Sequence, residues 1–178
     1  DDYEKIMDSA IPHIKNFMVG KSTRGYIKQL NDPDVPLWVI WSLQQYYLEF
    51  KDKFIEKYSD FLLEIINYIL DGKHHNLFFH KDNALLSTNG KDKPASWMNA
   101  IIDGQPVIPR SGYLVEFNAL WYNALKFAEE IAKEKGNIEL SNSLSFNAQT
   151  ACKSFTNTFM NDAGYLYDYV DGPYRDPN

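Results

Sequence analysis

The side chains best suited to chemistry lie in one stretch, "SWMNAIIDGQPVIPRSGYLVEFNALWYNAL". Its loop ends near Arg110, and the helix-like run that follows is apolar on almost every side yet contains Glu116. A guanidinium six residues before a carboxylate can pair with it or hydrogen-bond a hydroxyl-rich ligand. We expect this helix to line a cavity and to present Glu116 to a ligand, although a first-turn carboxylate also favours the helix dipole without any ligand.

Two amides and a second carboxylate extend this pattern. Glu116 and Asn123 are seven residues apart and share a helix face, whereas Asn118 points roughly the opposite way. Asn123 can serve a cavity or simply be a satisfied core amide. Asp34 precedes another apolar run and is expected either to cap that helix or to join the site. If the two helices run in the same direction, their N-termini open on one face and can form a pocket there.

The spacing of apolar residues predicts about five helices to position these groups. They are expected over residues 3–18 with a kink or division at Pro12, 34–50 with Pro36 in the first turn, 53–70, 112–135 and 139–161. Residues 73–111 are predicted as mostly loop, with short strands at "NLFFH" and "DNALL", and the tail "GYLYDYVDG" as a short strand or hairpin. Helix pairs alternating with long loops indicate an all-α array of helical hairpins. A loop of this length is more often functional than idle.

Composition narrows the class of protein. The 178 residues suit one domain or a piece of a larger one, and 44% hydrophobic content is enough for a sizeable core. The net charge of −6, without any Lys/Arg cluster, argues against nucleic acid or a membrane as partner. No signal peptide or long apolar run is present. Aromatics at 15% can form flat surfaces for a carbohydrate, although core packing explains them equally well.

Several short patterns imitate other sites. "GKST" at residues 20–23 copies the end of a phosphate-binding loop but lacks its upstream glycine and the preceding strand. His74 and His75 are adjacent and diverge, and only His80 lies near them, so no metal site is expected. The lone Cys152 cannot form an intrachain disulfide and is compatible with a cytoplasmic location. Neither a metal nor a cofactor is therefore expected.

Four motifs carry a family resemblance. They read Trp97-Met98-Asn99-Ala100, Pro109-Arg110-Ser111-Gly112, Val115-Glu116 and Asn118 to Leu125, and "DVPLWVIWSLQQY" lies upstream of them. On these residues the chain resembles the C-terminal glucosidase domain of glycogen debranching enzymes, the amylo-α-1,6-glucosidase family. The family reads Trp-Met-Asp-Ala, Pro-Arg-x-Gly, Val-Glu and Asn-Ala-Leu-Trp-Tyr-Asn-Ala-Leu, after an Asp-Ala-x-Leu-Trp helix. The resemblance covers roughly residues 30–130.

The resemblance implies an (α/α)6 toroid of helical hairpins with long loops on one face. Residues 1–178 are then expected to form a single partial domain, truncated at its C-terminus. The implied reaction is hydrolysis of the α-1,6-linked glucose stub at a glycogen branch point, with inversion, in the cytoplasm. Inversion needs one carboxylic acid for the leaving oxygen and one carboxylate to activate water. The implied partners are an α-glucan and the remainder of the parent chain, which is expected to supply the base beyond Asn178.

Two departures from the family pattern affect these expectations. Asn99 stands where the family has its general acid, and an amide has no titrating proton to donate, so acid catalysis there is expected to be lost or very weak. "DNALL" at residues 82–86 also replaces Asp-Gly-Leu-Leu, which puts the local turn in question. The matching residues are expected to bind substrate; they are Asp34, Trp38, Trp97, Arg110, Glu116, Asn118, Trp121 and Tyr122.

Four alternatives follow. The chain can belong to a catalytically inactive α-glucan-binding relative, or to an active enzyme that uses another acid such as Asp103 or Glu116. It can also belong to a different toroidal α-glycosidase, for example one acting on trehalose or on gluco-oligosaccharide ends. Finally, it can be a helical scaffold that binds no ligand.

Overall fold

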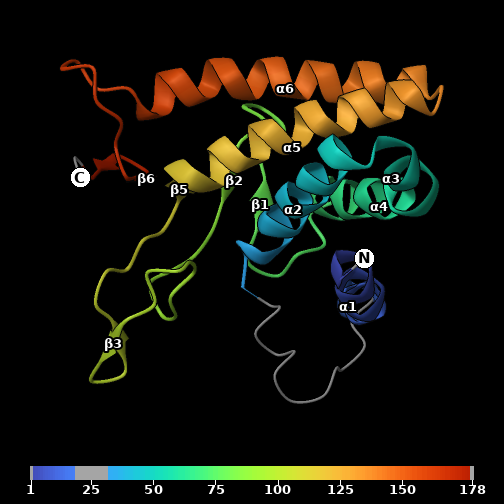
Figure 1. Ribbon diagram of the computed structural model, residues 1–178. Helices are drawn as coiled ribbons and strands as arrows, with labels where there is room; N and C mark the ends of the chain where they lie inside the picture. The colour runs from blue at the N-terminus through green and yellow to red at the C-terminus, as the bar shows by residue number, and fades with distance from the viewer. Residues whose placement is uncertain (1, 19–31, 177–178) are drawn as a thin grey trace.

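The computed structural model describes residues 2–18 and 32–176 and shows six helices in this part of the chain (Figure 1). The "GKST" pattern lies outside the described residues. The helices are α1 Asp2–Met18, α2 Val35–Glu49, α3 Lys51–Lys57, α4 Ser59–Leu70, α5 Val115–Glu134 and α6 Ile138–Phe159. None of the helices in the described ranges is long and apolar enough to cross a membrane.

Local sequence signals set several helix ends. Pro36 lies in the first turn of α2, where a missing backbone N–H removes no intrahelical hydrogen bond. Gly136, with φ of 73°, ends α5. The side chain of Asn137 then accepts a hydrogen bond from the backbone N–H of Leu140 and begins α6. The tight turn between α5 and α6 is therefore encoded locally.

Two helix expectations are corrected by the structure. The prediction of a single helix over residues 53–70 is wrong, because the helix is interrupted at Tyr58, whose φ and ψ are −122° and −9°. Tyr58 is 1% exposed, and its hydroxyl donates to Asp8 of α1 at 3.1 Å. The residue that interrupts the helix is therefore packed against a segment 50 residues earlier in the chain. Pro12 was expected to kink or divide the first helix; the division is wrong, because α1 is one helix from Asp2 to Met18 with Pro12 inside it.

Short strands fill the segments between the helices. They form three antiparallel sheets: β1 Phe78–Phe79 with β2 Leu86–Ser87, β3 Ile101–Ile102 with β4 Gln105–Pro106, and β5 Tyr113–Leu114 with β6 Tyr169–Asp171 and β7 Tyr174–Arg175. The all-α expectation is therefore corrected to a mainly helical fold. Long connections packed on helices must pair their backbone groups, and short ladders do this. The predicted strand in "NLFFH" is confirmed, and in the tail "GYLYDYVDG" the short strand is confirmed as β6, which pairs with β7 just beyond that stretch. The strand predicted in "DNALL" begins only at its last residue, Leu86.

The helices that carry the candidate carboxylates, α2 and α5, run in the same direction. Asn123 of α5 donates to Gln44 of α2 at 2.6 Å, and further along both helices Tyr47 of α2 donates to Glu130 of α5 at 2.6 Å. Contacts therefore advance together along the two helices, and their N-termini lie at the same end (Figure 1). This is the arrangement that the shared-pocket expectation required.

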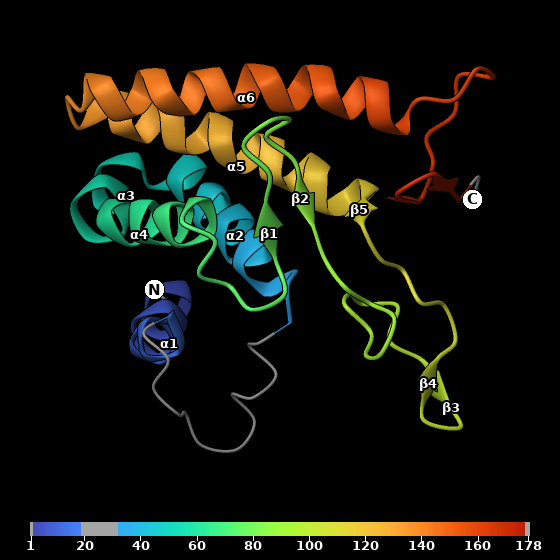
Figure 2. The ribbon, with the colours of Figure 1, turned by 180° about the vertical axis from the view of Figure 1, so that it is seen from behind.

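Two of the remaining helices, α4 and α6, run against these two. Helix α1 instead crosses them and is seen nearly end-on in Figure 1; the hydroxyl of Ser42, in the middle of α2, donates to Tyr3 at the start of α1 at 3.2 Å. Lys135, just after α5, donates to Ser59 at the start of α4 at 3.0 Å. The α5–α6 hairpin is antiparallel as well (Figure 2). Helices α2, α4, α5 and α6 thus alternate in direction, as in an array of helical hairpins.

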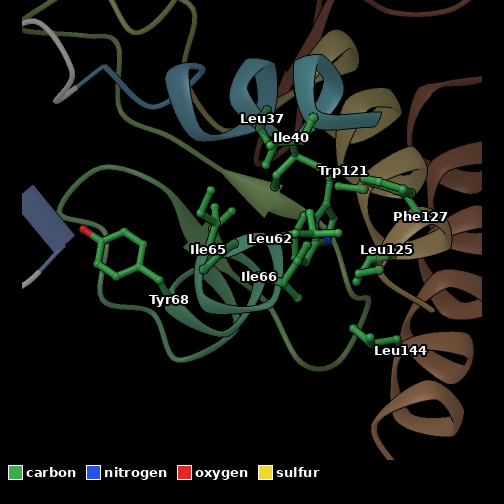
Figure 3. Close-up of a cluster of buried hydrophobic side chains, with 14 of the residues drawn as sticks. Leu37, Ile40, Leu62, Ile65, Ile66, Tyr68, Trp121, Leu125, Phe127 and Leu144 are labelled. Carbon is green, nitrogen blue, oxygen red and sulfur yellow. The ribbon is translucent and has the colours of Figure 1, made fainter. Parts of the chain in front are cut away.

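The core lies between α2, α4, α5 and α6. Trp121 is fully buried and contributes one of the largest side chains of the cluster, near Ile40 and Leu62 in Figure 3. The interface between α5 and α6 uses small buried residues, which let the helix backbones approach closely; they are Ala124, Ala128, Ala132, Ala148 and Ala151. The core thereby fixes α5, whose first turn carries Glu116.

Replacing Gly112 should destabilise the junction between the loop and the C-terminal strands. Its φ is 82°, and an added Cβ would lie 2.2 Å from the carbonyl oxygen of Val170. We expect Gly112→Ala to lower the free energy of unfolding by about 3 kcal/mol or more, because backbone strain of ~1–2 kcal/mol adds to a forced shift of β6. Urea unfolding followed by circular dichroism measures this.

Gly136→Ala is the matched control. Gly136 has a φ of 73° but no heavy atom within 4 Å of an added Cβ, so only the backbone strain should appear. Equal losses for the two variants would show that the contact with Val170 is unimportant.

Candidate active site

One buried arginine, Arg110, lies at the centre of the site. It is 4% exposed, and its Nη1 and Nη2 donate to Glu116 Oε1 and Oε2 at 2.5 and 2.7 Å. Its Nε and Nη2 donate to Asp168 Oδ2 and Oδ1 at 2.8 and 2.6 Å. Its Nη1 also donates to Ser96 Oγ at 3.2 Å. All five N–H donors of the guanidinium are therefore occupied.

Three separate segments bring these groups together. Glu116 lies in the first turn of α5, and Leu114 just before it pairs with Tyr169 in the β5–β6 ladder. The backbone N–H of Val115 donates to the carbonyl of Asp168 at 3.0 Å, which places that carboxylate beside the helix N-terminus. The third segment is the loop that ends at Arg110.

The loop approaches Arg110 closely at a glycine. An added Cβ on Gly90 would lie 2.0 Å from the carbonyl oxygen of Arg110, and the backbone N–H of Gly90 donates to Ser111 Oγ at 2.8 Å. No larger side chain fits there without displacing the backbone of Arg110. The position of the guanidinium is therefore set by backbone packing as well as by its ion pairs.

The pairing of Arg110 with Glu116, one of the two roles expected from the sequence, is confirmed, whereas Asp168 was missed. Its signal in the sequence was indirect: a buried arginine has five donors, and one carboxylate cannot accept from all of them. Burial raises the pKa of Asp168, against the lowering effect of Arg110. Burial also lowers the pKa of Arg110, but its hydrogen bonds with Glu116 and Asp168 raise it more, so the guanidinium keeps its charge.

Asp34 is a third carboxylate near this cluster. It stands at the N-cap position of α2, but its side chain makes no capping hydrogen bond. Burial raises its pKa, the charges of Asp32 and Glu116 raise it further, and a hydrogen bond with the Trp38 side chain lowers it. The charge of Glu116, in the first turn of α5, thus acts on Asp34 at the start of α2.

Three of the expected aromatic residues have exposed rings. Trp38 is 45% exposed, Trp97 69% and Tyr122 37%. Trp38 also meets Trp41 edge to face, with ring centroids 6.0 Å apart. Such rings offer flat apolar surface with a polar edge, which suits stacking against a sugar.

Two expected substrate residues are buried instead. Asn118 donates to the carbonyls of Leu86 and Leu114 at 3.0 and 2.9 Å and accepts from the N–H of Leu86 at 2.7 Å. The indole of Trp121 donates to the carbonyl of Ala84 at 3.1 Å. These bonds fasten the β2 segment to α5 and leave neither side chain a surface for a ligand. The expectation of direct substrate contact finds no support for these two residues in this structure.

Asn99 lies in an exposed part of the loop. Its backbone N–H donates to the carbonyl of Trp97 at 3.0 Å, and the β3–β4 hairpin that follows projects away from the helices (Figure 2). The hairpin turns at Asp103 and Gly104, with φ of 51° and 78°, an Asp-Gly turn that the sequence pattern contained but the strand prediction missed. Asp103 is therefore exposed at a hairpin turn.

The histidines do not form a metal site. Burial, and then the neighbouring His75, lower the pKa of His74 to about 4, and its Nδ1 accepts a hydrogen bond from the backbone N–H of Asn76 at 3.1 Å. Within residues 2–18 and 32–176, no group of three His, Cys, Asp or Glu side chains is placed to hold a metal ion.

The shared end of the two parallel helices thus carries carboxylates on a buried arginine and the exposed ring of Trp38, an arrangement suited to a carbohydrate. A family model described as Amylo-alpha-1,6-glucosidase matches residues 14–177. The chain belongs to this family of glycoside hydrolases, and the resemblance to the C-terminal domain of glycogen debranching enzymes is confirmed. No curated protein and no solved structure matches the chain.

Replacing Arg110 by lysine should destabilise the protein strongly. A lysine keeps the positive charge, but its three ammonium donors cannot form paired hydrogen bonds with both Glu116 and Asp168, so acceptors at the cluster lose their donors. Because both carboxylates are partly exposed, we expect a loss of about 2–4 kcal/mol in the free energy of unfolding, near the lower end for broken buried pairs. Urea unfolding measures it.

Arg175→Lys is the control for that substitution. Arg175 is exposed, and its Nη1 donates to the carbonyl of Thr158 at 2.7 Å. We expect a change within about 0.5 kcal/mol, as for most surface substitutions. Similar losses in the two variants would contradict a central role for Arg110.

Asp34→Asn should stabilise the protein at neutral pH. The pKa of Asp34 is raised in the folded state, so folding favours its neutral form. Ionisation of Asp34 therefore lowers stability as pH rises from the ordinary pKa of aspartate through the raised pKa. At pH values below the ordinary pKa it has no effect on stability. We expect the melting-temperature gain of Asp34→Asn to disappear as pH falls below the ordinary pKa of aspartate. A gain that is equally large at acid pH would contradict this.

Proposed function

We propose that this chain forms one wall of the α-glucan site of an amylo-α-1,6-glucosidase, within an (α/α)6 toroid. The observation that carries the proposal is the cluster of Arg110, Glu116 and Asp168 at the N-terminal end of α5, the end where α2 begins after Asp34. The alternating helix directions support the toroid, because helical hairpins that stack side by side have this alternation. Family membership supports the reaction class.

The exposed groups divide the work of binding. Asp34 and Glu116 accept hydrogen bonds from sugar hydroxyls, and Trp38, Trp97 and Tyr122 stack against sugar faces. Arg110 orients Glu116 and has no donor left for the sugar. Two further residues position this surface from within the core, Asn118 and Trp121. The substrate we propose is the α-1,6-linked glucose stub of a branched α-glucan in the cytoplasm.

Catalysis is the separate part of the proposal. Inversion requires an acid on the leaving oxygen and a carboxylate that activates water on the opposite face. Asn99 occupies the family's acid position and cannot donate a titrating proton. We place the water-activating carboxylate outside residues 1–178. On this basis the chain binds glucan and releases no glucose.

The side-chain amide of Asn99 also favours a second candidate function. A full-length protein that keeps Asn99 can be a non-catalytic α-glucan-binding member of the family. Asp103 is a weak replacement for the missing acid, because it lies at the exposed turn of the β3–β4 hairpin.

Glucan binding by the chain is the first test. We expect isothermal titration calorimetry with maltotetraose to show saturable binding, and Trp38→Leu to weaken it about fivefold through loss of a stacking surface worth ~0.5–1.5 kcal/mol. Phe146→Leu is the control, because Phe146 is 68% exposed on α6. Absence of binding by the wild-type chain would refute the proposed function.

Glucose release from a branched limit dextrin is the second test. The chain alone should show no turnover. In the full-length protein, Asn99→Asp should raise the rate by about 10²-fold or more if only the acid is missing, as general acid catalysis typically contributes, and Asn99→Ala should not. No gain would favour the non-catalytic member. The same assay with trehalose and α-linked disaccharides tests for a different α-glycosidase.

A further inference from the structure

The hydrogen-bond donors of Arg110 are all occupied, whereas the acceptors of its two carboxylate partners are only partly occupied. All five guanidinium donors are occupied, and the side chain is 4% exposed. The two carboxylates keep free capacity, because the side chains of Glu116 and Asp168 remain 27% and 23% exposed. A carboxylate offers about four lone-pair positions, and the arginine takes two from each. The free capacity of this cluster therefore consists of acceptors.

Most of the charges around this cluster are negative. Asp176 raises the pKa of Asp168 electrostatically, and Asp32 does the same for Asp34. The nearby Lys93 lies 3.8 Å from Asp32 and so offsets one of these carboxylates. Charges this close act on one another and on a ligand within the screening length of physiological salt, about 8 Å. The site therefore presents excess negative charge.

We propose that Asp168 is a specificity-determining residue of the glucan site: with Glu116 it presents only acceptors on Arg110, so the site takes neutral or cationic sugars and rejects phosphorylated ones. The inference rests on the proposed function and adds a residue and a charge selectivity to it. Each sugar hydroxyl that faces the pair acts as a donor. A phosphate group would meet two carboxylates and no free donor on Arg110.

Asp168 decides this selectivity because it closes one edge of the guanidinium. Without it, Nε and one Nη2 donor of Arg110 lose their acceptors, and an anion can bind along that edge. The loss of Glu116 would instead remove a first-turn carboxylate of α5. Asp168→Asn therefore removes the charge and replaces one of the two acceptors by an amide donor at the same place.

The experiment compares three probes on the chain by titration calorimetry and NMR: maltotriose, glucose 6-phosphate, and 1-deoxynojirimycin, whose ring amine carries a positive charge when protonated. The wild type should bind the phosphate ester at least about fivefold more weakly than the neutral sugar, since a unit charge nearby is worth ~1 kcal/mol or more. Asp168→Asn should lower the ratio of iminosugar to maltotriose affinity about tenfold and strengthen binding of glucose 6-phosphate.

Two further variants separate selectivity from folding. Asp162→Asn removes a charge of the same type from an exposed position after α6 and should leave the ratios unchanged. Asp168→Glu keeps the charge and should keep the preference for the iminosugar, even if its melting temperature falls.

The outcomes are distinct. Unchanged ratios in Asp168→Asn, or an equal loss for all three probes, would show a purely structural role and overturn the inference while the proposed function stands. If the wild-type chain binds neither maltotriose nor maltotetraose, the proposed function fails and the inference fails with it.

Discussion

A guanidinium that is 4% exposed must have every donor satisfied, and this requirement at Arg110 organises the site. Its hydrogen bonds reach Ser96 in the long loop, Glu116 at the start of α5, and Asp168 beside β6. Three segments far apart in the sequence are thereby held at one point. The close approach of Gly90 to the arginine backbone shows that the loop is shaped around this residue.

Because every donor of Arg110 must be satisfied within the protein, this residue supports the site and other side chains are left to contact a ligand. Arg110 is fully occupied, so it orients carboxylates rather than a ligand. The side chains of Asn118 and Trp121 likewise use their polar atoms in hydrogen bonds to the backbone of the β2 segment. The groups left with exposed surface are the carboxylates and the aromatic rings, such as Glu116 and Trp38. Family membership gives this surface its chemical context, because the reaction class requires recognition of a neutral, hydroxyl-rich sugar.

Much of the helical framework could be predicted because its signals are local. Apolar spacing gave α2, α5 and α6 nearly to their ends, and glycine and asparagine at residues 136–137 marked the α5–α6 turn. The break at Tyr58 escaped prediction because the apolar stripe continues through it, while packing against Asp8 of α1 accompanies the interruption. The β3–β4 hairpin had a recognisable Asp-Gly turn, but its strands are only two residues long.

The sequence by itself determined the family and most of the helix pattern, because motifs and periodicity depend on near neighbours along the chain, and it offered pairing with Glu116 as one of two roles for Arg110. Tertiary structure alone decided that Asp168 completes the arginine's hydrogen bonds and that Trp121 is core. Burial and long-range pairing depend on which elements pack together. The type of a residue does not tell which elements will pack around it. Trp121 could therefore be predicted from the sequence to stack on a sugar and still lie wholly inside the molecule.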